Sequence, residues 1–164
     1  MKIETARDLF VYELGLTRGL ERMGDRMLSE IAFELDNPDL RRLLHEGGEH
    51  RDRQSTNIDA CLEVVGFTPL GQRAPLVEAL RERYFNFKNT NPSSQALNLY
   101  AIGTALRFTE VVIATYRELM ALADLAGETE CRRRLEENCR HKIKYEEALV
   151  QYGVEVGLRI PVAP

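Results

Sequence analysis

The chain has 164 residues, 44% of them hydrophobic, which supplies enough apolar side chains for the core of one domain. Its formal net charge is −4, and no run of Lys or Arg lies beside aromatic residues, so a nucleic-acid-binding protein is not expected. The N-terminus becomes polar within a few residues and no apolar run approaches the length of a membrane span, so we expect a cytoplasmic protein that contacts no membrane.

Five helices are predicted from apolar residues that recur at helical spacing. The first begins after a capping box formed by Thr5 and Asp8. Asn37 is a suitable N-cap and Pro38 a suitable first residue for the second helix, which Gly66 ends. The predicted helices cover residues 6–35, 38–65, 75–88, 93–126 and 129–152.

The connections between these helices predict the topology. The first two helices, and likewise the last two, are joined by breaks of only a few residues, which fit antiparallel hairpins. Residues 66–92 form a long crossover between the hairpins, and this crossover contains the short helix. The sequence therefore predicts an all-α fold, a ferritin-like four-helix bundle with one long crossover carrying a short extra helix.

The bundle domain is expected to cover residues 1–152, and residues 153–164 are expected to form a C-terminal tail. The tail is rich in Val, Leu and Ile, and Pro161 prevents a helix from continuing past it. Apolar side chains on a short tail need a partner surface, and helices of the predicted length exceed what one small bundle can cover. We therefore expect a homodimer; the sequence identifies no other protein partner.

The three cysteines, Cys61, Cys131 and Cys139, are odd in number and show no CxxC spacing. This pattern disfavours disulfides and a structural zinc site. Cys61 and Cys139 fall on apolar helix faces, so we expect both to be small core residues.

The second predicted helix loses its apolar stripe in the middle. Gly47, His50, Arg51 and Gln54 occupy the face on which further leucines are expected. Helical bundles build buried sites from polar side chains in such positions. This stretch is therefore the first candidate for a functional site.

Three segments of the chain resemble one known family. The segment GFTPLGQRAPLVEAL (66–80) resembles the G-x-x-P-x-G-x-x-[CA]-x-x-[MV]-E-x-L stretch of the YciE/YciF family (DUF892). LFVYELGLTRGLERM (9–23) resembles the family's first helix, in which a glutamate matches Glu21, and IATYRELMALADLAG (113–127) resembles the end of its third helix. The resemblance implies a small, stress-associated, ferritin-like protein, often dimeric, with a carboxylate-rich dimetal site inside the bundle.

The chain departs from the family at most of the positions implied to hold the metals. The family pattern supplies E-T-x-x-[QH] on the second helix, V-E-H-Y-E on the third and E-E-x-x-[AT]-D on the fourth. Two divalent cations need mostly anionic ligands, and in this chain only the last matching position keeps an acid. The matching residues are His50, Arg51 and Gln54, then Thr109 and Val112, then His141, Lys142 and Glu146.

The direction of each polar residue follows from the apolar stripe of its helix, taken at about 100° per residue. By this criterion Glu110, Glu137 and His141 are predicted to face solvent. The inward positions hold two acids and two bases, which can neutralise one another, since buried charges persist only when they are paired. These inward residues, predicted to form a buried charge network, are Glu13, Arg51, Gln54, Lys142 and Glu146.

Lys142 is the sharpest part of this hypothesis. It is predicted to point inward at a position where the family pattern has a glutamate, and an ammonium there repels a divalent cation. We expect the Lys142 ammonium to pair with Glu146, Glu13 or Glu21 in place of a metal. In the alternative interpretation, Arg51 or Lys142 extends outward and the core is merely polar.

Three functions remain open. The favoured one is a non-catalytic, dimeric stress or interaction protein, with no catalytic residue and no cofactor, in which a salt-bridge network replaces the dimetal centre. The second is an oxidoreductase that binds iron or manganese through Glu21, His50, Gln54 and Glu146. The third is a binding module with an apolar pocket for a small ligand, lined by Tyr100, Phe108 and Phe10.

Overall fold

The computed structural model describes residues 2–46, 49–68 and 73–157, and for residues 46 and 49–52 it describes the backbone alone. Within these ranges all regular secondary structure is helical, which confirms the all-α prediction. The six helices are α1 (Ala6–Phe33), α2 (Pro38–Glu46), α3 (Glu49–Val65), α4 (Pro75–Lys88), α5 (Ser94–Ala126) and α6 (Thr129–Gly157).

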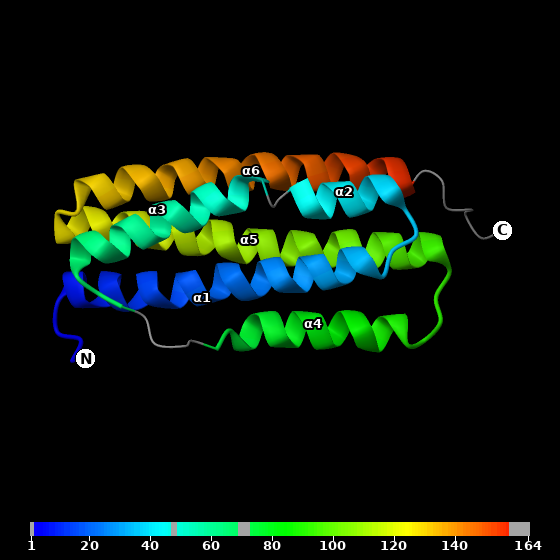
Figure 1. Ribbon diagram of the computed structural model, residues 1–164, viewed down its shortest axis with the longest axis horizontal. Helices are drawn as coiled ribbons and strands as arrows, with labels where there is room; N and C mark the ends of the chain where they lie inside the picture. Colours follow the sequence, from blue (N-terminus) through cyan, green and yellow to red (C-terminus); the bar gives the residue numbers. More distant parts are fainter. Residues whose placement is uncertain (1, 47–48, 69–72, 158–164) are drawn as a thin grey trace.

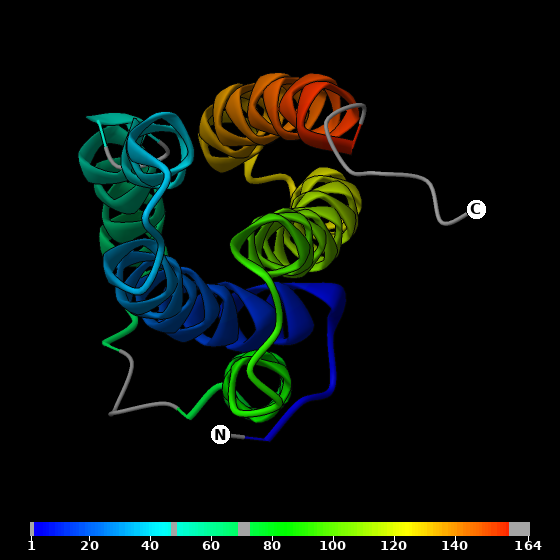
Figure 2. The same ribbon diagram turned by 90° about the vertical axis from the view of Figure 1, so that its right-hand side faces the viewer.

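Four helical rods form a bundle, and α4 lies outside it. α1, α5, α6 and the successive pair α2 and α3 run side by side along the molecule (Figure 1). α5 packs against α1 and α6, and α3 packs against the same two helices, which closes the bundle (Figure 2). α4 belongs to the long connection between α3 and α5 and packs on α1 and α5 from outside. This is the predicted ferritin-like bundle, with one long crossover that carries an extra helix.

The helix ends use the side chains predicted from the sequence. Thr5 Oγ1 accepts a hydrogen bond from Asp8 N at 3.1 Å, and Asp8 Oδ2 accepts one from Thr5 N at 2.9 Å, a capping box that begins α1. Asn37 Oδ1 accepts from Leu40 N at 3.0 Å and so caps α2. Gly127 ends α5 with a φ of 74°, a left-handed conformation that glycine adopts without steric cost. Both short turns of the bundle are therefore fixed by local chemistry.

Two of the first predicted boundaries differ from the structure. α1 ends at Phe33, slightly before the predicted end at residue 35. The helix predicted over 38–65 is observed as α2 and α3, and residues 47–48 between them lie outside the described residues. The prediction followed the apolar periodicity, which continues on both sides of the Gly47-Gly48 pair.

The predicted end of the last helix at residue 152 is too early, because α6 continues to Gly157. Its last turns pack on the bundle: Val156 is buried, and a Cβ atom built on Gly153 would lie 3.3 Å from Ile102 Cγ2 of α5. Tertiary packing here overrides the low helix propensity of glycine and valine. Residues 158–164, the rest of the predicted tail, lie outside the described residues.

α5 is an unusually apolar helix. An 18-residue window of it has a mean hydropathy of 1.2, so by length and composition it could cross a membrane, contrary to our expectation from the sequence. In the bundle 44% of that window is buried, and α5 contacts α1, α4 and α6. Because neighbouring helices cover α5 on several sides, its high apolar content is that of a core helix.

α1 and α5 approach closely where Gly24 faces Phe108. A Cβ atom built on Gly24 would lie 1.8 Å from Phe108 Cζ, far inside contact distance. The missing side chain at Gly24 therefore makes room for the Phe108 ring, which is fully buried. This ring lies 5.8 Å from the ammonium of Lys142, so the close approach of the two helices borders the polar centre of the bundle.

Candidate functional site

A buried ion pair joins the first and last helices of the bundle. Lys142 of α6 and Glu21 of α1 are each only 6% exposed. Lys142 Nζ lies 2.7 Å from Glu21 Oε2, a charge-assisted hydrogen bond as well as an ion pair. The geometry confirms that Lys142 points inward and pairs with one of the three expected acids, and it identifies that acid as Glu21.

The second oxygen of Glu21 is also engaged. The Tyr116 hydroxyl of α5 donates to Glu21 Oε1 at 2.7 Å, and Asn138 Nδ2 of α6 donates to the same hydroxyl at 3.2 Å. The Lys142 ammonium also lies over the Phe108 ring, at a distance that permits a cation–π contact. Lysine, tyrosine and carboxylate thus satisfy one another's hydrogen bonds inside the bundle, as buried polar groups require.

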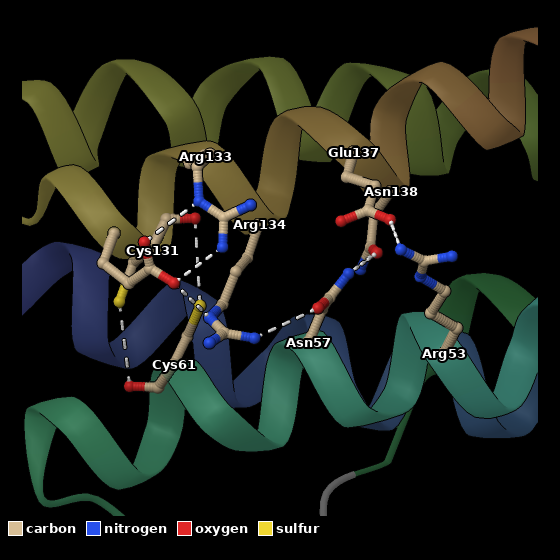
Figure 3. A network of polar contacts seen from close by, with 9 residues as sticks. Arg53, Asn57, Cys61, Cys131, Arg133, Arg134, Glu137 and Asn138 are labelled. Atoms are coloured by element: carbon tan, nitrogen blue, oxygen red, sulfur yellow. Dashed lines mark hydrogen bonds and ion pairs between the residues drawn. The ribbon is translucent and has the colours of Figure 1, made fainter.

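From Asn138 the hydrogen bonds continue along the α3–α6 interface. Asn138 Nδ2 also donates to the Gln54 backbone oxygen at 3.0 Å. Asn57 Nδ2 donates to Asn138 Oδ1 at 2.8 Å (Figure 3). Arg134 Nη1 donates to Asn57 Oδ1 at 3.4 Å and brings the series to the surface, where its side chain is 31% exposed. We call the connected side chains the buried polar chain; its members are Glu21, Lys142, Tyr116, Asn138, Asn57 and Arg134.

The electrostatics of the buried polar chain keep Tyr116 neutral. Burial raises the pKa of Tyr116 well above its usual value, and the neighbouring Glu21 carboxylate raises it further. The hydroxyl therefore stays protonated and serves as a donor to Glu21 throughout the physiological pH range. In the pair itself, one positive and one negative charge cancel, so the centre of the bundle carries no net charge from these residues.

The other predicted charged residues lie apart from this pair. Glu13 is partly buried; its pKa is raised by burial and then by Glu118 of α5, another acid rather than a base. Glu146 is also partly exposed, and no ion pair joins it to Lys142 among the described side chains. Gln54 is buried as predicted, but its backbone oxygen joins the buried polar chain, and its Oε1 has no partner within the described residues.

Two predicted site residues cannot be placed. The side chains of His50 and Arg51 lie outside the described residues, although the α3 backbone passes through both positions. Of the residues predicted to face solvent, Glu110 is exposed, whereas Glu137 is partly buried and forms an ion pair of 2.6 Å with Arg53. His141 is also partly buried.

The side chains of the described residues do not fit a dimetal centre. Among them, no group of three or more His, Cys, Asp or Glu residues could hold a metal ion. Thr109 and Val112, at two family ligand positions, are buried, and the Thr109 hydroxyl donates to the Ala105 backbone oxygen at 2.9 Å. Glu21 offers a carboxylate, but an ammonium already contacts it. Two divalent cations require several anionic ligands, which these positions do not supply.

The aromatic residues proposed as a ligand pocket pack into their surroundings. Phe10 and Phe108 are fully buried in the core. Tyr100 stacks on Phe87 of α4 with 3.9 Å between ring centroids, and its hydroxyl accepts from Arg83 at 3.0 Å. A cavity of about 180 Å³ lies elsewhere, between α1 and α3, where Glu21 is part of its wall.

Sequence reasoning missed four members of the buried polar chain: Tyr116, Asn138, Asn57 and Arg134. One signal was available, because Asn138 precedes Lys142 by one helical turn and therefore shares its inward face. Asn57 follows Gln54 at the same kind of spacing on α3. The hydroxyl of Tyr116 gave no such signal, since a tyrosine on an apolar stripe is expected simply to be a core residue.

A four-helix bundle with one long crossover, and with polar side chains that converge from all four rods, defines the ferritin-like class of proteins. The chain belongs to the DUF892 family, described as a domain of unknown function, which matches residues 5–157. No functionally curated protein matches the chain in sequence.

Several solved structures share the fold. The E. coli stress protein YciF superposes with a TM-score of 0.89 at 20% identity, over 96% of this chain and 100% of YciF. YcfI from Rhodopseudomonas palustris gives a TM-score of 0.83 at 22% identity, over 90% and 94% of the two chains. A two-domain protein from Anabaena variabilis that contains a ferritin-like domain gives 0.71 at 17% identity, over 98% of this chain and 40% of that one. The chain is therefore similar to YciF in fold over nearly its whole length.

Proposed function

We propose that this chain is a non-catalytic, YciF-like protein in which an internal ion pair takes the place of a dimetal centre. One observation carries the proposal: the 2.7 Å contact between the Lys142 ammonium and the Glu21 carboxylate in the middle of the bundle. Glu21 matches an acid of the family's first helix, and Lys142 occupies a position where the family pattern has an acid. A positive charge of the protein itself thus neutralises the carboxylate.

Electrostatics make the lysine and a metal mutually exclusive. A dication 4 Å from an ammonium is repelled by roughly 8 kcal/mol at an effective dielectric constant of about 20. A single remaining carboxylate cannot offset that repulsion and also supply a coordination sphere. The role that remains is a structural one or the binding of another protein. As part of the proposal, we extend to this chain the association with stress that the description of YciF gives.

We also propose that the protein is a homodimer. Several large apolar side chains are exposed in the single chain, among them Phe33 at 81% at the end of α1. On α6, Val150 is 50% exposed and Val154, one turn later, is 59% exposed. Such surface supports burial against a second copy.

Thermal melting with and without manganese or ferrous iron tests the ion-pair proposal. Wild type should melt at the same temperature in both buffers. Lys142→Met keeps the volume of the stem but leaves Glu21 buried without a counter-charge, which should cost about 3–5 kcal/mol. Lys142→Glu should cost more in metal-free buffer, and added metal should restore part of the loss, because a cation can then bind between the carboxylates.

The double variant Lys142→Met/Glu21→Gln is the matched control. It removes both charges, so it should recover much of the stability lost in Lys142→Met. The proposal is wrong if wild-type melting rises with metal, or if Lys142→Met lies within about 0.5 kcal/mol of wild type. An oxo-bridged absorption band from wild type with ferrous iron would favour the metal-binding oxidoreductase instead.

A further inference from the structure

We infer that Cys61 and Cys131 form a redox-active dithiol that a hydroperoxide oxidises to a disulfide between α3 and α6. This inference is independent of the proposed function. The sequence pattern disfavoured disulfides, because the three cysteines are odd in number and show no CxxC spacing, and Cys61 and Cys131 are 70 positions apart. The fold brings them together.

The two thiols face each other across the helix interface. Cys61 Sγ lies 3.8 Å from the Cys131 backbone oxygen, and Cys131 Sγ lies 4.0 Å from the Cys61 backbone oxygen (Figure 3). Each sulfur thus reaches the backbone of the other residue, so the two backbones approach within about one side-chain length. A disulfide requires such an approach of the two main chains. Both cysteines are free and fully buried.

The surroundings distinguish the two sulfurs chemically. The interaction between the two thiols raises the pKa of Cys61 and lowers the pKa of Cys131. Cys131 also lies in the first turn of α6, where the helix dipole favours a thiolate, and the Arg134 guanidinium lowers its pKa further. Cys131 is therefore the better nucleophile and Cys61 the resolving thiol.

Access depends on the end of the helix. Cys131 is the third residue of α6, directly after the turn at Gly127 and Glu128. Local opening at a helix end costs less free energy than global unfolding. Hydrogen peroxide is close to water in size, so such an opening is sufficient to admit it.

The chemistry balances with one molecule of hydrogen peroxide. The Cys131 thiolate attacks a peroxide oxygen and breaks the O–O bond; the leaving hydroxide takes up the proton that the Cys131 thiol released and becomes water, and Cys131 becomes a sulfenic acid. The Cys61 sulfur then attacks the sulfenic sulfur, and its thiol proton leaves with the displaced hydroxide as a second water. Two thiols are oxidised by two electrons, and the peroxide is reduced to two waters.

The disulfide would act on the same interface as the buried polar chain. On α3, Asn57 lies one turn before Cys61; on α6, Arg134 lies one turn after Cys131, and these two residues are hydrogen-bonded to each other. Oxidation would therefore fasten α3 to α6 one turn beyond the Asn57–Arg134 hydrogen bond, at the end of the interface where α6 begins. A covalent clamp there would reduce opening of α3 from the bundle.

The experiment uses the wild-type chain treated with hydrogen peroxide, then denatured, alkylated with a maleimide and mapped by mass spectrometry. We expect two of the three cysteines to become unreactive, a cross-linked peptide pair that contains Cys61 and Cys131 with a mass loss of two hydrogens, and full reversal by dithiothreitol. Three reactive thiols after treatment would overturn the inference, and so would sulfinic acid at Cys131 without a cross-link.

Cys139 provides the matched control, since it is a buried thiol on the same helix. Cys139→Ser should leave the cross-link intact. Cys61→Ser should abolish it and leave a sulfenic acid at Cys131 that dimedone traps. The oxidised wild type should also melt above the reduced protein, because the cross-link restricts the unfolded chain. A cross-link that persists in Cys61→Ser, or an oxidised form that melts no higher than the reduced form, would contradict the proposed clamp.

Discussion

Two fully buried tyrosines differ in what their hydroxyls contact. The Tyr116 hydroxyl donates to Glu21 at 2.7 Å and accepts from Asn138, whereas the Tyr84 hydroxyl has no hydrogen-bond partner among the described residues. Burial raises the pKa of both, to about 12 for Tyr84. The same chemical group is therefore a satisfied member of a network in one place and an unpaired buried hydroxyl in the other.

This difference predicts opposite effects of the same substitution. Tyr116→Phe removes a donor to a buried carboxylate and should cost about 1–3 kcal/mol in the free energy of unfolding. Tyr84→Phe removes a hydroxyl that lacks a partner and should be neutral or slightly stabilising. Urea unfolding of the two variants and of wild type measures both effects. Equal effects in the two variants would show that the hydrogen bonds of the Tyr116 hydroxyl add no net stability.

At this scale the sequence predicted directions better than partners. The inward direction of Lys142 and Gln54 followed from the apolar residues around them. The partner of Lys142 could not be predicted in the same way. Periodicity gives the direction of a side chain around its own helix axis only to within about half of the rotation between successive residues, and it gives no information on the residues of the facing helix. Glu21, on the flank of its stripe, is buried because α5 and α6 place Tyr116 and Lys142 against it.

The pairing of α1 with α5 depends on the size of one residue. Gly24 faces the Phe108 ring so closely that even a methyl group would overlap it. Gly103, on α5, is different: a Cβ there would approach only the guanidinium of Arg107, at 3.4 Å, the end of a flexible and exposed side chain. Two glycines in long helices thus have different roles, one in packing and one with no steric function.

Alanine substitutions should separate these roles. Gly24→Ala should destabilise the bundle by about 1–3 kcal/mol or more, because the buried ring must move in an already filled core. Gly103→Ala should instead stabilise it by about 0.5–1 kcal/mol through higher helix propensity. Differential scanning calorimetry measures both changes. A Gly24→Ala protein that melts like Gly103→Ala would refute the close packing of Phe108.

Helix positions were predictable where local chemistry decides them. α4 spans the predicted residues 75–88, since Pro75 is well suited to the first turn of a helix. The extension of α6 to Gly157 was not predictable, because it depends on contact with Ile102, which is distant in sequence. The meeting of Cys61 and Cys131 was missed for the same reason: it exists only after α3 and α6 pack together.

At the scale of the whole molecule, the proposed homodimer can be tested directly. Sedimentation at micromolar concentration should show a species of twice the 18.8 kDa chain mass. Charges on the outer face of the last turns of α6, in Val150→Glu/Val154→Glu, should shift the protein toward monomer, because both side chains are exposed and apolar. Leu125→Glu is the control: this residue is exposed in the last turn of α5, at the opposite end of the bundle, and the variant should stay dimeric. A wild type that sediments only as an 18.8 kDa species contradicts the dimer.

The buried polar chain also determines the register of the bundle. Apolar side chains pack acceptably in several registers, since their attraction has no direction. The hydrogen bonds of Glu21, Tyr116 and Asn138 do have direction, and they join α1, α3, α5 and α6 at one level. If α1 or α6 slid by one turn, the Glu21 carboxylate and the Lys142 ammonium would be buried and uncompensated. If α3 or α5 slid, Asn138 or Glu21 would lose a buried hydrogen bond. The polar centre thus fixes the axial positions of the four helical rods relative to one another. It selects one alignment from the several that the apolar core alone would tolerate.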